Sequence, residues 1–184
     1  MSSVWDSVWK HRRVISDYSL QYFRFMERFA QCLKKDAKVL EAGCGSGDSL
    51  ASFPEQETYG LDFSEESLKL ARHHTQHVVH ADLFKMPFKD ETFDLVYNSG
   101  VLEHYPEPKN LEGAKEMARV TKKGGYVIII LPNAYCLWYR LYKWLVIAIT
   151  GAWEFGYEEE YSHQRLKTLV RRAGLKLEDV FGLQ

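Results

Sequence analysis

A glycine-rich turn directly after a short apolar run is the feature that most constrains the fold of this chain. The stretch "VLEAGCGSG" covers residues 39–47, and glycine takes every second position from 43 to 47. Because the residues between the glycines are as small as Cys44 and Ser46, the backbone can approach a ligand closely. A turn of this kind between a strand and a helix favours a sheet that binds a ligand at the carboxyl ends of its strands.

Strand-like and helix-like segments alternate along the chain. Strands are expected at 38–43, 57–63, 77–84, 92–100, 126–133 and 175–182. Helices are expected at 4–35, 64–74 and 108–122, with a last one that begins after Ser162 and ends at Gly174. Ser64 should cap the second helix, Gly124 and Gly125 should close the third, and the very apolar strand 126–133 should be central. The alternation predicts an α/β fold with a mostly parallel, doubly wound, Rossmann-like sheet in one domain.

Composition and charge narrow the class of protein. A chain of 184 residues can bury a proper core, and its net charge of −1 provides no overall basic field for nucleic acid. Its three cysteines (Cys32, Cys44 and Cys136) share no metal-like spacing, and their odd number argues against a disulfide framework. With no apolar signal core at the N-terminus, we expect a reducing, cytoplasmic compartment.

Acidic residues lie at or near the carboxyl ends of three predicted strands. Glu41 lies before the glycine turn, Asp62 ends the second strand and Asp82 lies in the third. These residues should face one crevice, where they would repel a polyphosphate and suit a cationic nucleoside. The spacing G-x-G-x-G also differs from the dinucleotide pattern G-x-G-x-x-G, which disfavours a nucleotide-dependent oxidoreductase. Two alternatives stay open: Asp82 could cap a turn, and Glu41 could only brace the loop.

Four stretches together resemble the successive motifs of class I S-adenosylmethionine-dependent methyltransferases. They are "VLEAGCGSG", "YGLDFSEESLKLAR", "VVHADLFKMPFKDETFDLVYNSGVLEHYPEP" and "ARVTKKGGYVIIILPN", which lie within residues 37–133. The branch they resemble most is the small-molecule type that includes the ubiquinone and menaquinone methyltransferases. The resemblance implies S-adenosylmethionine as cofactor, with S-adenosylhomocysteine as product, and methyl transfer to a small, apolar or aromatic acceptor.

The resemblance also implies roles for individual residues. The methionine part of the cofactor would pass the glycine turn, Asp62 would hold the ribose, and Asn98 would offer its backbone carbonyl to the methionine ammonium. Asp82 and Leu83 would contact the adenine edge, and Phe63 would flank the ring. The full set of implied cofactor-binding residues is Glu41, Gly43, Cys44, Gly45, Gly47, Asp62, Phe63, Asp82, Leu83 and Asn98. Within it, Cys44 is interpreted as a small filler rather than a nucleophile.

Methyl transfer from a sulfonium needs alignment and exclusion of water more than it needs a catalytic triad. A general base helps if the acceptor has a proton to lose, and His104 in "GVLEHYP" is the candidate, against the alternative of a structural histidine. Glu103 is interpreted as structural. Tyr18 and Tyr135 are candidates to line the acceptor pocket.

Four histidines in "HHTQHVVH" invite a zinc interpretation, which we reject. His73 and His77 would share a helix face only if the helix continued, whereas His80 belongs to the next strand. No metal site is expected.

A long aromatic segment, 134–161, separates the fifth strand from the last helix. Within it, 137–150 is too short to span a bilayer but shows an apolar helical stripe with Arg140 and Lys143 beside it. It could be a lid over the acceptor, ordinary core or a homodimer interface, or a contact with a membrane surface.

The single domain is thus divided into an N-terminal helical cap (1–36), a cofactor-binding core (37–133), the aromatic insertion (134–161) and a last helix and strand (162–184). The family usually ends with an antiparallel pair of strands, and the second of these is not expected here, as in a shortened or a naturally short member. The rival hypothesis is therefore a non-catalytic domain that binds S-adenosylmethionine or a partner. A nucleic-acid methyltransferase fits the charge less well.

Overall fold

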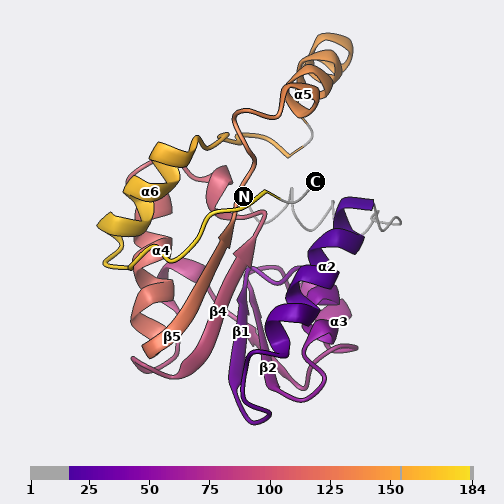
Figure 1. Ribbon diagram of the computed structural model, residues 1–184. Helices are drawn as coiled ribbons and strands as arrows, with labels where there is room; N and C mark the ends of the chain where they lie inside the picture. Colours follow the sequence, from indigo (N-terminus) through magenta and orange to yellow (C-terminus); the bar gives the residue numbers. More distant parts are fainter. Residues whose placement is uncertain (1–16, 154, 183–184) are drawn as a thin grey trace.

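The computed structural model describes residues 17–153 and 155–182, which form an α/β layer structure around one sheet (Figure 1). Its strands are β1 (Lys38–Ala42), β2 (Glu57–Asp62), β3 (His77–His80), β4 (Phe93–Ser99) and β5 (Thr121–Ile130). They lie in the order β3-β2-β1-β4-β5, and every pairing is parallel. The prediction of a mostly parallel, doubly wound sheet is confirmed.

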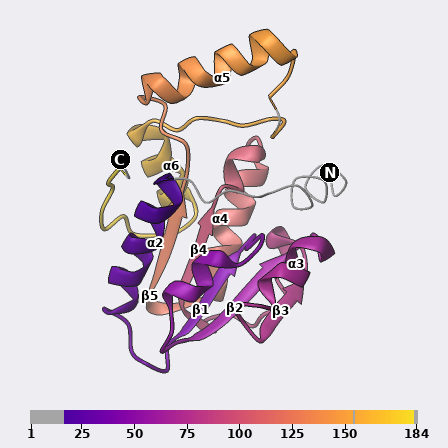
Figure 2. The ribbon, with the colours of Figure 1, turned by 90° about the vertical axis from the view of Figure 1, so that its right-hand side faces the viewer.

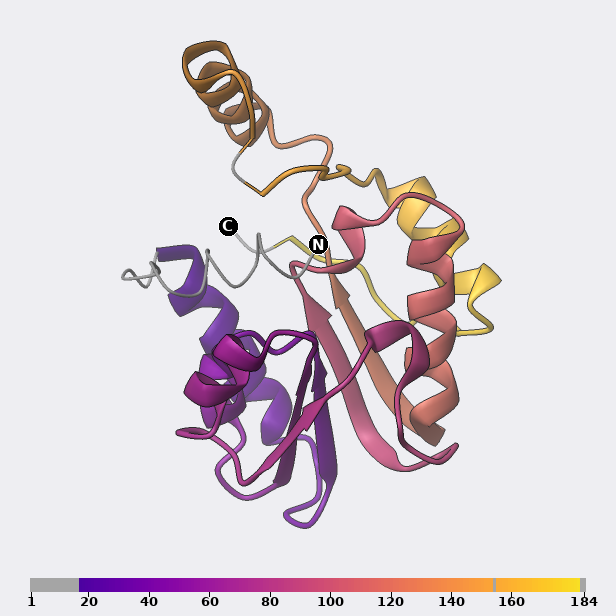
Figure 3. The same cartoon turned by 180° about the vertical axis from the view of Figure 1, so that it is seen from behind.

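Helices cover both faces of this sheet. On one side lie α2 (Asp17–Ala30) and α3 (Glu65–Ala71), and on the other lie α4 (Lys109–Val120) and α6 (His163–Arg172), as Figures 1 and 3 show. Three short 3₁₀ helices follow strand ends: η1 (Asp48–Ser52), η2 (Leu83–Lys85) and η3 (Leu102–His104). One further helix, α5 (Leu137–Thr150), lies at one end of the molecule.

The core follows from the alternation of side chains along the strands. Val39 and Leu95 pack with Met26 of α2, whereas Leu40 and Val96 pack on the opposite face with Met117 of α4; all six are fully buried. Because both faces are covered, the strands need apolar residues at consecutive positions.

Two helix starts were predicted correctly. The Ser64 hydroxyl accepts a hydrogen bond from the Ser67 amide at 3.3 Å, and the Ser162 hydroxyl accepts one from the Arg165 amide at 3.3 Å. Gly174, with φ +81°, follows the last helix as expected.

The predicted position of the fifth strand was wrong. The strand begins at Thr121 and already contains Gly124 and Gly125, so α4 ends two residues earlier than expected and the glycines do not close it. The strand also lies at the edge of the sheet rather than at its centre. Its apolar composition reflects the cover that it receives on both faces, where Ile128 packs with the α2 side and Val127 with the α4 side.

Two other boundaries differ from the prediction. The third strand ends at His80 instead of residue 84, because Asp82 starts the turn of η2. The segment 175–182, expected to be a strand, has no regular structure; it crosses the molecule and places Phe181 against Phe25 of α2, with ring centroids 4.7 Å apart. Residues 4–16 of the expected first helix lie outside the described residues.

Substitution of Gly113 by alanine tests how closely α4 approaches the loops after β3 and β4. A Cβ there would lie 2.7 Å from Cδ2 of both Leu102 and Leu83. Alanine in a helix normally stabilises a protein by about 0.5–1 kcal/mol relative to glycine. Here overpacking should reverse the sign, so that Gly113→Ala lowers the free energy of unfolding in urea by about 1–3 kcal/mol. The exposed Lys115→Ala on the same helix is the control, and a stabilised Gly113→Ala would contradict the described packing.

Candidate functional site

All strands of the sheet are parallel, so the carboxyl ends of β1, β2, β3 and β4 lie on the same side of it, where the arrows in Figure 1 end. This side is called the carboxyl edge of the sheet. The register pairs Ala42 with Leu61 and Asp62 with His80, so the strands end at nearly the same level. The loops that follow these strands carry most of the predicted cofactor residues. The topology therefore brings the glycine turn and the acidic strand ends together.

The glycine turn has a backbone that other residues adopt with difficulty. Gly43, Gly45 and Gly47 have φ values of +79°, +53° and +75°, in the left-handed region. A Cβ on Gly43 would lie 2.5 Å from Cγ2 of Val101, and one on Gly47 would lie 3.0 Å from Cβ of Ala71. The turn is therefore packed tightly from the protein side.

Asp62 joins the turn after β1 to the turn after β2. Its Oδ2 accepts a hydrogen bond from the Gly45 amide at 2.8 Å, and its Oδ1 accepts one from the Ser64 amide at 2.9 Å. Burial raises the pKa of the carboxyl, while the bonds from Ser64 and Gly45 oppose that rise. Asp62 therefore positions the glycine turn in addition to any contact with a ligand.

Glu41 lies behind the turn and is buried. Burial raises the pKa of its carboxyl to about 8, although hydrogen bonding from Ser49 and Tyr97 acts to lower it. Its Oε2 has no hydrogen-bond partner among the described residues. A buried carboxyl oxygen without a partner is costly, so the site is suited to a group that donates a proton or carries a positive charge.

Asn98 connects β4 to the end of β1. Its side-chain amide donates to the carbonyl oxygen of Ala42, and its Oδ1 accepts from the Leu102 amide at 3.4 Å. The side chain is fully buried. Asn98 therefore fixes the relative position of the loops after β1 and β4, which is a role that the sequence did not reveal.

The predicted adenine-side residues lie around η2. Asp82 is exposed, and its Oδ1 accepts from the Phe84 amide at 2.9 Å, so it caps the turn as the open alternative proposed. Leu83 is buried in the core against α4, and Phe63 is half-buried at the end of β2. Capping occupies Oδ1 of Asp82, and a second role toward a ligand would use its other oxygen.

Tyr105 is a site residue that the sequence interpretation missed. Burial raises the pKa of its phenol, and the negative charges of Asp82 and Asp62 raise it further. Its ring also packs edge-on against Phe84, with centroids 4.7 Å apart. In the sequence, Tyr105 could have been found from its position directly after Glu103 and His104, in the loop that follows the fourth strand.

His104 and Glu103 face the segment 155–161, which runs back from α5. The Nδ1 of His104 lies 2.7 Å from the Tyr157 carbonyl oxygen, and the Glu159 amide donates to the backbone carbonyl of Glu103 at 2.9 Å. Burial lowers the pKa of His104 and raises that of Glu103 to about 8. The imidazole is thus neutral at pH 7, with Nδ1 as the donor to the carbonyl and the lone pair on Nε2.

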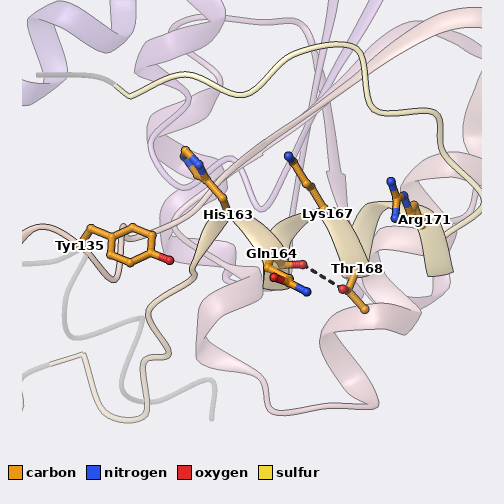
Figure 4. A pocket seen from close by; sticks show the side chains of 6 residues that line it. All are labelled: Tyr135, His163, Gln164, Lys167, Thr168 and Arg171. Atoms are coloured by element: carbon orange, nitrogen blue, oxygen red, sulfur yellow. Dashed lines mark hydrogen bonds between the residues drawn. The ribbon is translucent and has the colours of Figure 1, made fainter.

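Of the two tyrosines predicted to line an acceptor pocket, only Tyr135 can be placed, and it does not share a hollow with the glycine turn. The side chain of Tyr18 lies outside the described residues. Tyr135 is 65% exposed and contributes to a shallow hollow of about 320 Å³ with His163, Lys167 and Arg171 of α6 (Figure 4). This hollow is lined by none of the glycine-turn residues or strand-end acids.

Two alternatives from the sequence concern Cys44 and the histidines. Burial raises the pKa of the Cys44 thiol far above its usual range, which fits a small packing residue and not a nucleophile. His73 lies in a turn after α3, His77 pairs with Glu57 at 3.6 Å, and His80 bonds the Phe63 carbonyl at 2.8 Å. Within the described ranges no cluster of potential ligands could hold a metal ion.

Taken together, the carboxyl ends of the strands offer acids and aromatic rings around one tight turn. Glu41, Asp62 and Asp82 provide acceptors, while Tyr105 and Phe84 provide flat apolar surface. Such a set suits a cationic nucleoside and does not suit a polyphosphate, which would need Lys, Arg or a metal ion.

Comparisons with known proteins agree with this chemistry. Residues 40–129 match the family described as "Methyltransferase domain". The demethylmenaquinone methyltransferase of Staphylococcus aureus (strain JH9) is 34% identical over 144 residues, an alignment that covers 70% of this chain. The chain spans only 59% of the length of that relative.

Solved structures share the fold. A SAM-dependent methyltransferase from Thermotoga maritima superposes with a TM-score of 0.70 at 24% identity, covering 95% of this chain and 81% of its own. A SAM-dependent methyltransferase from Archaeoglobus fulgidus does so with a TM-score of 0.70 at 21% identity, covering 86% and 69%. At these identities the likeness establishes the fold.

The pH dependence of stability tests the state of Glu41. Its pKa is raised from 4.5 to about 8 in the folded chain. Between these values the unfolded chain loses the proton and the folded chain keeps it, so this group makes the free energy of unfolding fall as pH rises. The slope from one such group is at most about 1.4 kcal/mol per pH unit. Glu41→Gln should remove this contribution, giving a flatter curve of urea stability between pH 5 and 8. Parallel curves for the two proteins would show that Glu41 is ionised in the folded chain.

Proposed function

We propose that this chain, whose residues 40–129 match a methyltransferase domain, is a class I S-adenosylmethionine-dependent methyltransferase that transfers the methyl group to a small, apolar or aromatic acceptor. The observation that carries the proposal is the Asp62 carboxylate, which holds the Gly45 amide at 2.8 Å and so couples the glycine turn to the acidic end of the second strand. The buried oxygen of Glu41 that lacks a partner supports a cationic cofactor at the same edge.

Each part of the cofactor has a counterpart at this edge. In the proposal, the glycine turn faces the methionine part, Asp62 receives the ribose hydroxyls and the Asn98 carbonyl receives the ammonium. Asp82 and Leu83 take the adenine edge, and Phe63 flanks the ring. The residues present fit the cofactor because Asp62 and Asp82 offer carboxyl groups and Asn98 offers a backbone carbonyl, all of them acceptors, whereas the sulfonium and ammonium groups are cationic.

Methyl transfer from S-adenosylmethionine requires the protein mainly to position the cofactor and the acceptor. Bound S-adenosylmethionine supplies a methyl group already activated by the positive sulfur. The chain would align the acceptor with the methyl group and exclude water, with Tyr105 and Phe84 as apolar cover near the acids. His104, neutral and with its lone pair on Nε2, is the group proposed to take a proton from a phenolic acceptor.

The acceptor class rests on two supports. The relative from Staphylococcus aureus is named for demethylmenaquinone, and the motifs of this chain resemble the same branch. The segment 134–161 is also rich in aromatic and aliphatic side chains, as an apolar acceptor would require. A homodimer interface in the segment 134–161 stays a separate prediction.

Asp62→Asn tests cofactor binding. The amide keeps the shape of the side chain but replaces one of its two accepting oxygens with an NH2 donor, so the affinity for S-adenosylmethionine should fall by about tenfold to a hundredfold. Calorimetric titration with S-adenosylmethionine and S-adenosylhomocysteine measures the change.

The exposed Asp36→Asn, in the turn before β1, is the matched control and should bind as the wild type does. Circular dichroism checks that each variant is folded. If Asp62→Asn unfolds, Asp82→Asn serves instead, because its capping bond is exposed and its loss should be tolerated. A folded wild-type chain that binds neither cofactor form would refute the proposal. Binding without methyl transfer to any acceptor would favour the non-catalytic alternative.

The pH profile of His104→Asn separates a base from a structural histidine. The pKa of His104 lies below its usual 6.5, so wild-type kcat/KM toward a short-tailed naphthoquinol should fall only when pH drops below that value. The variant should lose this acidic limb together with most of its activity. An equal proportional loss at every pH would assign His104 to holding the Tyr157 carbonyl alone.

A further inference from the structure

α5 is an apolar helix in which no residue is fully buried. It contributes no residue to the buried core, and its outermost residues, Trp138 and Ile149, are each 81% exposed. Figure 2 shows α5 running across one end of the molecule, beyond the sheet and the other labelled helices. The end in question is the one toward which the strands point, so α5 and the candidate site share the same end of the fold.

The exposed residues form one broad face. With about 100° between successive residues, the uncharged side chains from Trp144 round to Tyr142 cover an arc of about 160°. The members of this face, here called the outer face of α5, are Leu137, Trp138, Leu141, Tyr142, Trp144, Leu145, Ala148 and Ile149. An uncharged arc this wide exceeds the stripe that one packed helix normally needs.

The charges of α5 are turned toward the body and neutralised. Lys143 Nζ lies 3.0 Å from Glu158 Oε1, and both side chains are largely buried. Arg140 Nε lies 3.2 Å from Glu160 Oε2. The Tyr139 hydroxyl also donates to Glu158 at 2.5 Å. Both cations of α5 are therefore engaged by the segment 155–161, and its outer face is left purely apolar.

The outer face is the convex surface of a single helix, which at 14 residues is about 21 Å long. A convex apolar surface of this kind suits a deformable apolar medium better than a pocket. No helix in the described ranges is long and apolar enough to cross a membrane.

We propose that α5 is an interfacial helix that lies in the plane of a lipid bilayer, with its outer face at the boundary between headgroups and acyl chains. Tryptophan and tyrosine side chains favour that boundary, and helices of this pattern bind there without spanning. The inference deepens the proposed function and rests on it in one respect: an acceptor with an apolar tail would be reached from the bilayer. The path to the site is short, because segment 155–161 bonds Glu103 and His104 directly.

Vesicle sedimentation of the full chain tests this inference. The wild type should bind zwitterionic phosphatidylcholine vesicles, with a blue shift of tryptophan fluorescence, and binding should persist at high salt because the cations of α5 are paired. Trp138→Glu and Leu145→Glu should each lower the partition coefficient by about tenfold or more.

Leu70→Glu on α3 is the matched control, since Leu70 is as exposed as Leu145 and lies on a different helix; it should bind vesicles as the wild type does. Calorimetry with S-adenosylmethionine should give equal affinities for all four proteins, which separates this inference from the proposed function. Absence of vesicle binding would overturn the inference, as would binding only to anionic vesicles that high salt removes. A wild-type dimer in solution that the α5 variants dissociate would show that a second copy is the occupant.

Discussion

The pair of backbone hydrogen bonds accepted by Asp62 is the interaction on which the rest of the site depends. One bond reaches the glycine turn after β1 and the other reaches the start of α3, so a single side chain sets the distance between two loops. Asn98 does the same for the loops after β1 and β4. The loops after β1, β2 and β4 are therefore preorganised by two buried polar side chains, before any ligand binds.

The sequence was informative wherever local chemistry determines the structure. Ser64 and Ser162 identified helix starts because a hydroxyl satisfies free amides, and the alternation of apolar runs with helical periodicity predicted the parallel sheet. The glycine turn and Asp62 could be recognised for the same reason. Left-handed backbone favours glycine, and an acid at the end of a strand is visible in the sequence.

The errors concern features set by distant contacts. β5 has a composition that suits a central strand, yet its place at the edge depends on which strands remain to pair with it. Residues 175–182 have strand-like composition but no partner, and Phe181 packs on Phe25 instead. Tyr105 was missed because its proximity to Asp62 and Asp82 follows from the fold and not from spacing. The surroundings of His104 depend in the same way on segment 155–161, which contacts its imidazole and whose path no periodicity predicts.

The tight packing behind the glycine turn also limits how such a sequence can change over time. Gly43 lies against Val101, Gly47 against Ala71, and Gly60 against the Cys44 sulfur, which a Cβ at Gly60 would approach to 2.9 Å. At Gly43 and Gly47 the positive φ disfavours any larger residue whatever the space, whereas at Gly60 a larger residue needs a smaller partner at position 44. Covariation among homologues should therefore be concentrated at positions 44 and 60, while positions 43 and 47 should stay glycine.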